Sequence, residues 1–251
     1  MRRVYPITII LLFVLIMCTA CATPQKELII PFDLTDITAS PSYKITIERL
    51  SQGGVTIHYP QLHGLADADK EQAINGLIKE SILPLAFQTS DYFIMDMACQ
   101  ISRRSDTLLS ILYQGAATSN NYNGNVIYST TIDLETVKIL NLPDFVNIDR
   151  NLVTTIRYAK EVTGGPRLYG ADKSPLVDEL RNGANSGIYE GLWRAGNGGY
   201  YEFCVAPNAI IISVPVSHAG GDYALVRIPG QYDADGRFHY TPIVLPVDLK
   251  N

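Results

Sequence analysis

The chain has 251 residues, of which 47% are hydrophobic and 18% are charged, and its formal net charge is −5 at pH 7. This length suits one large or two small domains, and the apolar content is sufficient for a hydrophobic core. The acidic balance argues against nucleic acid and other polyanions as partners, and it mildly favours basic partners.

The first residues have the pattern of a bacterial export signal. Two arginines precede an apolar stretch over 7–17, and small residues then lead to Cys21. This order resembles a lipoprotein signal, so we expect residues 1–20 to be removed and Cys21 to carry a lipid; acylation of Cys18 would require cleavage after the bulky Met17. An uncleaved anchor is the alternative, although a membrane span needs about 20 apolar residues. Both interpretations place the remaining chain at the outer face of the membrane, because positive residues stay inside.

A tether and a hairpin are predicted next. Residues 21–42 contain three prolines and no sustained periodicity, which is typical of an extended spacer. The stretches 43–49 and 55–59 then alternate between apolar and polar residues on either side of Gly53 and Gly54. This pattern predicts two strands joined by a turn.

One helix and three strands are predicted after the hairpin. Apolar residues recur at helical spacing from Ala73 to Ile82, with Asp67 or Asp69 as the cap and with Pro84 ending or kinking the helix. The following alternation predicts strands over residues 93–101, 109–113 and 126–132. The apolar face of the first of these strands, which includes Met95, Met97 and Cys99, is expected in the core.

The second half is predicted to contain helices and then strands. The helical pieces are expected over 149–162 and 175–181, and the strands over 200–205, 209–214 and 223–228. Strands on both sides of helical segments predict an α+β fold, in which helices pack on an antiparallel sheet. We expect an N-terminal domain over 43–146 and a C-terminal domain over 147–251, as two halves that share one compact unit.

Metal and disulfide chemistry receive little support. Outside the signal, Cys99 and Cys204 are the cysteines; a disulfide is possible outside the cell, but two separate buried thiols fit the pattern better. The acidic residues Asp67, Asp69 and Glu71 fit a helix cap better than a calcium loop. We expect no metal and no cofactor, because the histidines also lack the spacing of a zinc site. These histidines are His58, His63, His218 and His239.

The segment 216–223 is the most enzyme-like part of the sequence. It places His218 and Asp222 on either side of Gly220 and Gly221. A catalytic histidine needs an oriented acid and a nucleophile or water within reach, and the flexible glycines do not predict a fixed geometry. Because Gly and Asp are common in turns, we interpret the segment as structural and expect no catalytic residues. A hydrolase that uses His218 and Asp222 is the less favoured alternative.

Three aromatic residues are candidates for ligand binding. Tyr189, Trp193 and Tyr200 lie in or beside the Gly- and Asn-rich stretch 183–199. Aromatic side chains on adaptable loops serve as binding anchors. The chain has a single tryptophan, and filling the core is an equally good interpretation of it.

Several short motifs carry a family resemblance that covers about residues 43–230. In the first half they are Tyr59-Pro60-Gln61-Leu62, Gly64-Leu65, Ile74-Asn75-Gly76-Leu77-Ile78, Tyr113-x-Gly115, Ile132-Asp133-Leu134 and Leu142-Pro143-Asp144-Phe145. In the second half they are Tyr201-Glu202-Phe203, Ala209-Ile210-Ile211-Ile212, Pro215, Gly220-Gly221-Asp222-Tyr223 and Ile228-Pro229. The chain resembles an extracellular domain pair of unknown function, found in the anti-sigma-V factor ectodomain and in the non-catalytic region of a peptidoglycan deacetylase.

The resemblance implies an α+β fold and a role in binding, since the anti-sigma-V factor ectodomain binds lysozyme. Two departures limit what it implies. Few residues precede the apolar run, so we expect no cytoplasmic domain that holds a sigma factor. We also expect no metal-binding deacetylase domain. We therefore expect a non-catalytic, surface-tethered binding or sensing lipoprotein with a lysozyme-like extracellular protein as its ligand. A cell-wall glycan binder or envelope scaffold is the alternative.

Overall fold

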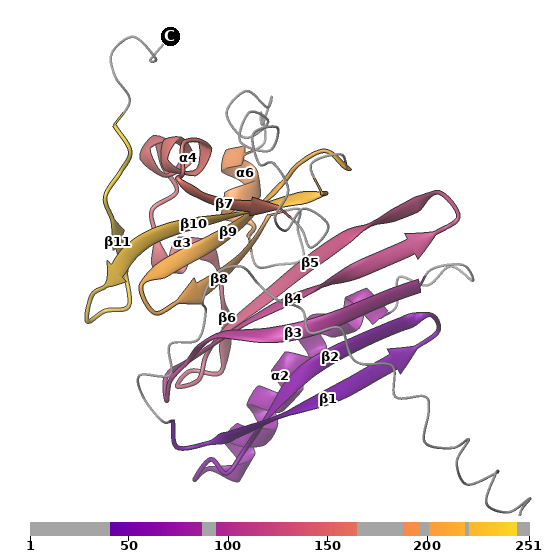
Figure 1. Cartoon of the computed structure of the whole chain (residues 1–251). Coiled ribbons are helices and arrows are strands. Elements are labelled where there is room, and N and C mark those ends of the chain that lie inside the picture. Colours follow the sequence, from indigo (N-terminus) through magenta and orange to yellow (C-terminus); the bar gives the residue numbers. More distant parts are fainter. Residues whose placement is uncertain (1–40, 87–93, 165–187, 196–200, 219–220, 245–251) are drawn as a thin grey trace, which may run out of the picture.

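The strands of this protein form two sheets that pack against each other (Figure 1). The computed structural model describes residues 41–86, 94–164, 188–195, 201–218 and 221–244. The export signal, Cys21, nearly all of the tether and the helix predicted over 175–181 lie outside these residues. None of the described helices has the length and apolar composition that a membrane span needs.

The first sheet has six strands in the order β1-β2-β3-β4-β5-β6. Neighbouring strands are antiparallel except β2 and β3, which run parallel because the chain crosses over through a helix between them. The strands are β1 (Lys44–Gln52), β2 (Val55–His63), β3 (Ile94–Arg104), β4 (Leu108–Ser119), β5 (Tyr122–Asp133) and β6 (Lys138–Leu140).

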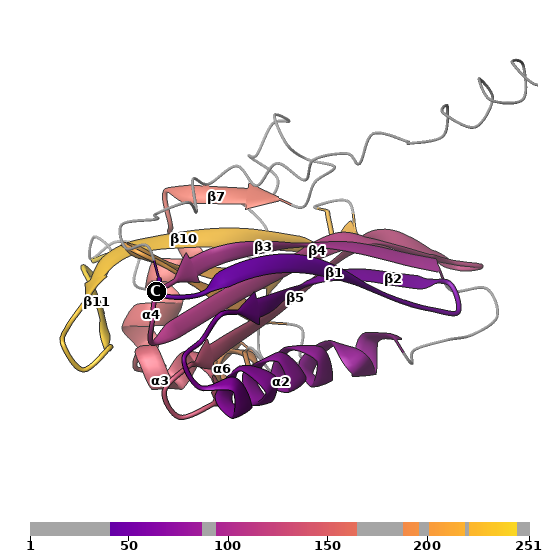
Figure 2. The ribbon, with the colours of Figure 1, turned by 90° about the horizontal axis from the view of Figure 1, so that it is seen from below.

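Helix α2 (Ala68–Ala86) covers one face of the first sheet (Figure 2). Asp67 caps it, because its Oδ1 accepts the N–H of Lys70 at 3.0 Å. The helix continues past Pro84 to Ala86, so a stop at this proline is wrong. The apolar stripe of α2 packs on the sheet in a core that includes Ile74, Ile78, Ile82, Val55, Ile57, Met95, Met97, Ile111, Tyr113 and Ile132.

The second sheet has the order β11-β10-β9-β8, and β7 pairs with the outer edge of β10. Its strands are β7 (Glu161–Gly164), β8 (Glu202–Ala206), β9 (Ala209–Pro215), β10 (Tyr223–Tyr232) and β11 (Phe238–Tyr240). Three helices, α3 (Leu142–Phe145), α4 (Arg150–Arg157) and α6 (Ile188–Trp193), contribute to the core on one face of this sheet. Buried members of this core are Leu142, Phe145, Leu152, Ile156, Leu192, Phe203, Ile212, Val226 and Ile228.

Helix α4 is shorter than the sequence predicts. It ends at Arg157, and the N–H of Tyr158 returns to the carbonyl of Thr154 at 3.1 Å. Val162, which the periodicity places in the helix, lies instead in β7 opposite Val226. The prediction failed there because pairing with β10 overrides a continuing apolar period.

The other face of the second sheet packs on the first sheet. Leu112 of β4 meets a cluster of second-sheet residues that includes Cys204, Ile211 and Leu225. The predicted α+β fold, with two halves in one compact unit, is therefore confirmed.

The two described cysteines are separate free thiols. Cys99 contacts the core under α2, whereas Cys204 lies between the sheets. Burial raises the pKa of each thiol to about 12. The structure therefore agrees with the prediction of two separate thiols and not with a disulfide between Cys99 and Cys204.

Candidate functional site

The segment with His218 and Asp222 is a closed turn between β9 and β10. The N–H of Val216 donates to the carbonyl of Asp222 at 3.1 Å, and the N–H of Asp222 donates to the carbonyl of Ser217 at 3.1 Å. Gly221 and Asp222 have φ values of 93° and 72°. This left-handed backbone suits Gly and is tolerated by Asp, so the sequence pattern matches the turn.

The side chains of His218 and Asp222 are in contact, with Nδ1 of the imidazole 2.7 Å from Oδ1 of the carboxylate. Our expectation that the intervening glycines leave this pair without fixed geometry is wrong. Backbone hydrogen bonds close the turn and hold the two side chains together. The His218 side chain is 64% exposed, whereas that of Asp222 is 13% exposed.

The second oxygen of Asp222 binds the first sheet. Oδ2 accepts the N–H of Asn125 in β5 at 2.6 Å, and Nδ2 of Asn125 donates to the carbonyl of Gly221 at 3.0 Å. Strand β6 pairs only with residues 131–133 of β5, so the earlier amides on this edge of β5 need other acceptors. Asp222 supplies one of them, which gives its carboxylate a structural role.

Glu202 plays the same role farther along β5. It is fully buried, and its Oε2 accepts both the N–H of Ser129 at 2.9 Å and the Ser129 hydroxyl at 2.5 Å. In return, the first sheet satisfies the free edge of β8. The N–H of Phe203 donates to the Ser129 hydroxyl at 3.2 Å, and the N–H of Val205 donates to the Ser110 hydroxyl at 3.0 Å.

We call this set of contacts the edge joint. It consists of Ser110, Asn125, Ser129, Glu202 and Asp222. Each sheet presents an open strand edge to the other, and side chains of the opposite sheet satisfy its amides. Because unsatisfied buried amides are costly, the edge joint fixes how the two halves sit on each other.

The aromatic candidates have different outcomes. Trp193 ends α6 and is 57% exposed, so the interpretation that it fills the core is wrong; its neighbour Leu192 is buried instead. Tyr189 lies in the same helix. Tyr200 lies outside the described residues.

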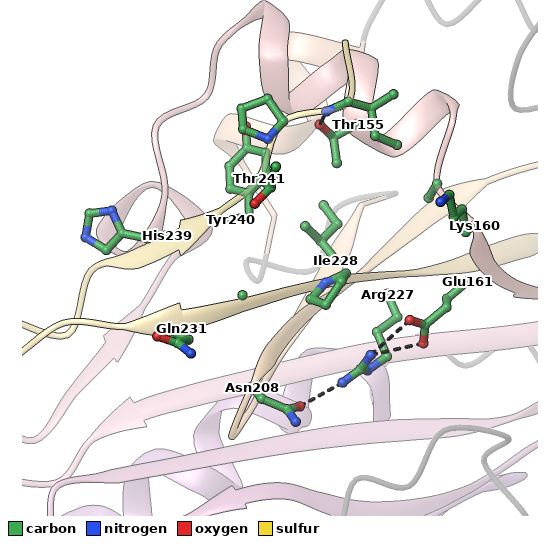
Figure 3. Close-up of a pocket in the computed structure, with 15 residues that line it drawn as sticks. Thr155, Lys160, Glu161, Asn208, Arg227, Ile228, Gln231, His239, Tyr240 and Thr241 are labelled. Atoms are coloured by element: carbon green, nitrogen blue, oxygen red, sulfur yellow. Dashed lines mark hydrogen bonds and ion pairs between the residues drawn. The ribbon is translucent and has the colours of Figure 1, made fainter. Parts of the chain in front are cut away.

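An open notch of about 940 Å³ lies at the outer edge of β10 (Figure 3). Strand β7 pairs with residues 224–227 of this edge and β11 pairs with residues 230–232. Among the described residues, no strand pairs with this edge at Ile228 and Pro229, and the notch lies there. Its lining residues are Thr155, Ala159, Lys160, Glu161, Asn208, Arg227, Ile228, Pro229, Gly230, Gln231, His239, Tyr240, Thr241, Pro242 and Ile243.

Most of the charged groups around the notch pair with each other. Nη1 of Arg227 lies 3.1 and 3.0 Å from the two carboxylate oxygens of Glu161, and its Nη2 donates to Oδ1 of Asn208 at 2.7 Å. Nε2 of His239 lies 2.7 Å from Oδ2 of Asp233, and this contact lowers the pKa of the carboxyl group. Among the described residues, no group of three or more His, Cys, Asp and Glu side chains is placed to hold a metal ion.

Tyr240 forms the aromatic part of the lining. Its ring stacks on Phe238 with centroids 6.3 Å apart and planes 14° apart. Burial, followed by repulsion from Asp149, raises the pKa of Tyr240 to about 12. The phenol therefore stays neutral and can donate or accept a hydrogen bond.

Comparison with known proteins yields a fold similarity. The solved structures that resemble this chain include the following two. One is a member of the DUF3298 family from Bacteroides fragilis, with a TM-score of 0.48 and 10% identity over 75% of this chain and 91% of that chain. The other is a DUF3298 family protein from Pseudomonas aeruginosa, with a TM-score of 0.43 and 9% identity over 76% and 91% of the two chains. No family model and no curated protein matches the sequence.

Sequence reasoning missed the edge joint and the notch. The available signal for the joint was the polar alternation of β4 and β5, in which Ser110, Gln114 and Ser129 lie on the face away from α2. That pattern is also typical of a solvent-facing strand. The notch depends on where two short strands end, and the sequence gives no local signal for this.

Proposed function

We propose that this chain is a non-catalytic binding module, held at the outer face of a bacterial membrane by a lipid on Cys21. The observation that supports a non-catalytic role is the position of Asp222. Its carboxylate is shared between His218 and the amide of Asn125 on the other sheet. His218 and Asp222, the most enzyme-like pair in the chain, thus have a structural explanation. The turn also accounts for the position of the exposed His218 imidazole.

The first candidate ligand is a lysozyme-like extracellular protein. The family resemblance supports it, and the net charge of −5 suits a basic partner and would accelerate encounter. The exposed indole of Trp193 adds a side chain of the kind that anchors protein interfaces.

The second candidate ligand is a cell-wall glycan. The notch beside β10 supports it, because its lining includes the side-chain amides of Asn208 and Gln231, which can exchange hydrogen bonds with sugar hydroxyls. Ligand sites of 300–1,000 Å³ are typical for small molecules, and the notch falls within this range.

A pull-down with the full chain in detergent tests the proposal. Immobilised protein is incubated with lysozyme and, separately, with purified cell wall, over a range of salt concentrations. We expect capture of lysozyme that weakens as salt rises, because screening reduces attraction between opposite charges. Capture of neither ligand would contradict a binding role, and capture of cell wall alone would select the second candidate.

A further inference from the structure

Strand β1 lies at one edge of the first sheet. Among the residues that the structure describes, β2 is the strand that pairs with it. Figure 1 shows β1 at the margin of the molecule, on the side away from the second sheet. The strand has nine residues, which is long for a strand with an open edge. Such an edge presents a row of N–H and C=O groups that can pair with a strand of another chain.

The hairpin turn determines which residues of β1 face the open edge. Gln52 and Val55 flank a two-residue loop, so the carbonyl of Gln52 accepts the N–H of Val55. Hydrogen bonding to β2 then recurs at every second residue along β1, because the register is continuous. The residues between them direct their backbone groups away from β2; they are Ile45, Ile47, Arg49 and Ser51.

The side chains of β1 complement those of a second copy in one antiparallel register. When Thr46 lies opposite Thr46 of the second copy, Lys44 lies opposite Glu48. The same register places Ile45 opposite Ile47, and two-fold symmetry makes each of these contacts twice. Opposite charges and β-branched apolar side chains that face each other across an antiparallel pair stabilise it. The backbone agrees with this register, because Ile45 and Ile47 both point their N–H and C=O groups outward.

The other registers that keep these backbone groups paired are less favourable. Sliding the second copy one way places Glu48 opposite Thr46 and then opposite Glu48. Sliding it the other way places Lys44 opposite Thr46 and then opposite Lys44. The ion pairs are lost in the first step and like charges meet in the second, which is destabilising. Charges on an edge strand usually prevent pairing, whereas those of β1 select one register of self-pairing.

The side chains that would meet are accessible on the surface. Lys44, Thr46 and Glu48 are exposed, and Ile45 is half-buried. Ile47 is 54% exposed although it is a large apolar residue. Pairing with Ile45 of a second copy would remove part of this apolar surface from water, which is favourable.

We propose that β1 is a homodimer interface, in which the open edges of two copies pair antiparallel about Thr46. The pairing joins the two first sheets into one continuous sheet. Because the contact consists of a single strand pair, it is small and weak, and we expect a dissociation constant on the order of 100 µM. This inference goes beyond the proposed function and is independent of which ligand the module binds.

Sedimentation equilibrium of the full chain, in a detergent matched to the solvent density, measures the self-association. Lys44→Glu replaces two attractive contacts with two repulsive ones and should weaken dimerisation about tenfold. Adding Glu48→Lys restores opposite charges, so the double variant should return to within about twofold of wild type. Lys138→Glu makes the same charge change in β6, at the opposite edge of this sheet, and should leave dimerisation unchanged.

Cysteine cross-linking of the full chain tests the register. Thr46 would form a non-hydrogen-bonded pair with its counterpart, with Cα atoms about 4.5 Å apart, which is within disulfide range. Thr46→Cys should therefore give a disulfide-linked dimer under mild oxidation. Ser51→Cys would lie roughly 30 Å from its counterpart and should not. Both positions are exposed, so the melting temperatures should stay close to that of wild type.

Three results would overturn the inference. They are a chain that stays monomeric well above the expected dissociation constant, a double variant that dimerises no better than Lys44→Glu, and equal cross-linking of Thr46→Cys and Ser51→Cys. A monomeric chain would leave the β1 edge available to a strand of a different protein. Capture of lysozyme or cell wall by such a monomer would leave the proposed function intact.

Discussion

Replacing Asp222 tests the edge joint most sharply. Asp222→Ala removes the acceptor of the Asn125 amide, and Asn125 is only 5% exposed. Losing a hydrogen bond of this kind costs about 1–3 kcal/mol. Alanine at a φ of 72° adds about 1–2 kcal/mol, so we expect a loss of about 3 kcal/mol in the free energy of unfolding.

Two further variants separate these contributions. Asp222→Gly relieves the backbone strain but still lacks the acceptor, and we expect it to lose about 2 kcal/mol. Asp222→Asn keeps a carbonyl oxygen and tolerates the left-handed backbone, so we expect a loss of about 1 kcal/mol. His218→Ala removes an exposed imidazole and its contact with Asp222, and it should cost less than about 1 kcal/mol.

Urea denaturation followed by circular dichroism measures these losses. Each loss in the free energy of unfolding is the shift in the urea midpoint multiplied by the common m-value. The predicted order of stability is wild type, His218→Ala, Asp222→Asn, Asp222→Gly and Asp222→Ala. If the free energy of unfolding of Asp222→Ala is within about 0.5 kcal/mol of the wild-type value, the Asp222 carboxylate does not stabilise the contact between the sheets. If His218→Ala lowers the free energy of unfolding as much as Asp222→Ala does, the His218 imidazole accounts for most of the stability that the pair contributes.

Four other predictions follow from single residues. Gly115→Ala should destabilise the protein by at least about 2 kcal/mol in thermal or urea unfolding, because a Cβ would collide with the carbonyl oxygen of Asp96 across the β3–β4 pair; wild-type stability would contradict that pairing. Gly76→Ala should stabilise α2 by about 0.5–1 kcal/mol in the same assay, since its Cβ would meet no atom within 4 Å, and a lower midpoint would refute this. Burial raises the pKa of Cys204 from 9.0 to about 12, so between these pH values the unfolded chain loses a proton that the folded chain keeps. The free energy of unfolding should therefore fall from about pH 9 to pH 12. Because Cys204 is buried, iodoacetamide should label it at pH 9 only after denaturation. Rapid labelling of Cys204 in the native protein would contradict this burial. Mass spectrometry of the mature N-terminus should find diacylglycerol on Cys21 and no residues 1–20, and Cys21→Ala should release or mislocalise the protein; an intact N-terminus or a start at Cys18 would show the anchor to be different.

Local patterns were sufficient for the longer elements of the fold. Alternation predicted β3 with Met95 and Met97 in the core, and the structure places both at no more than 3% exposure, in the core under α2. Alternation also predicted parts of β4 and β5, because a period of two is the pattern of a strand. The stretches that became β9 and β10 were predicted as strands between turns, and the structure buries β9 on both faces. Strands β6 and β11 have three residues each, which is too short for any period to be seen.

Tertiary pairing accounts for the remaining differences. Val162 follows the apolar period of α4 but pairs with β10, and the parallel alignment of β2 and β3 is set by how the chain crosses over. The polar residues of the edge joint could not be recognised, because Ser129 beside a buried carboxylate has the same sequence signature as Ser129 in water. Glu202 is the extreme case, since an isolated glutamate in a strand pattern indicates an exposed face.

The most direct test of a non-catalytic binding role combines melting and capture in one variant. Wild type and His218→Ala, as full chains in detergent, are compared for melting temperature and for capture of lysozyme and of purified cell wall. We predict the same capture by both proteins and melting temperatures that differ little. If His218→Ala keeps its melting temperature but loses capture, the turn is itself a functional site, and the structural interpretation of His218 and Asp222 is contradicted.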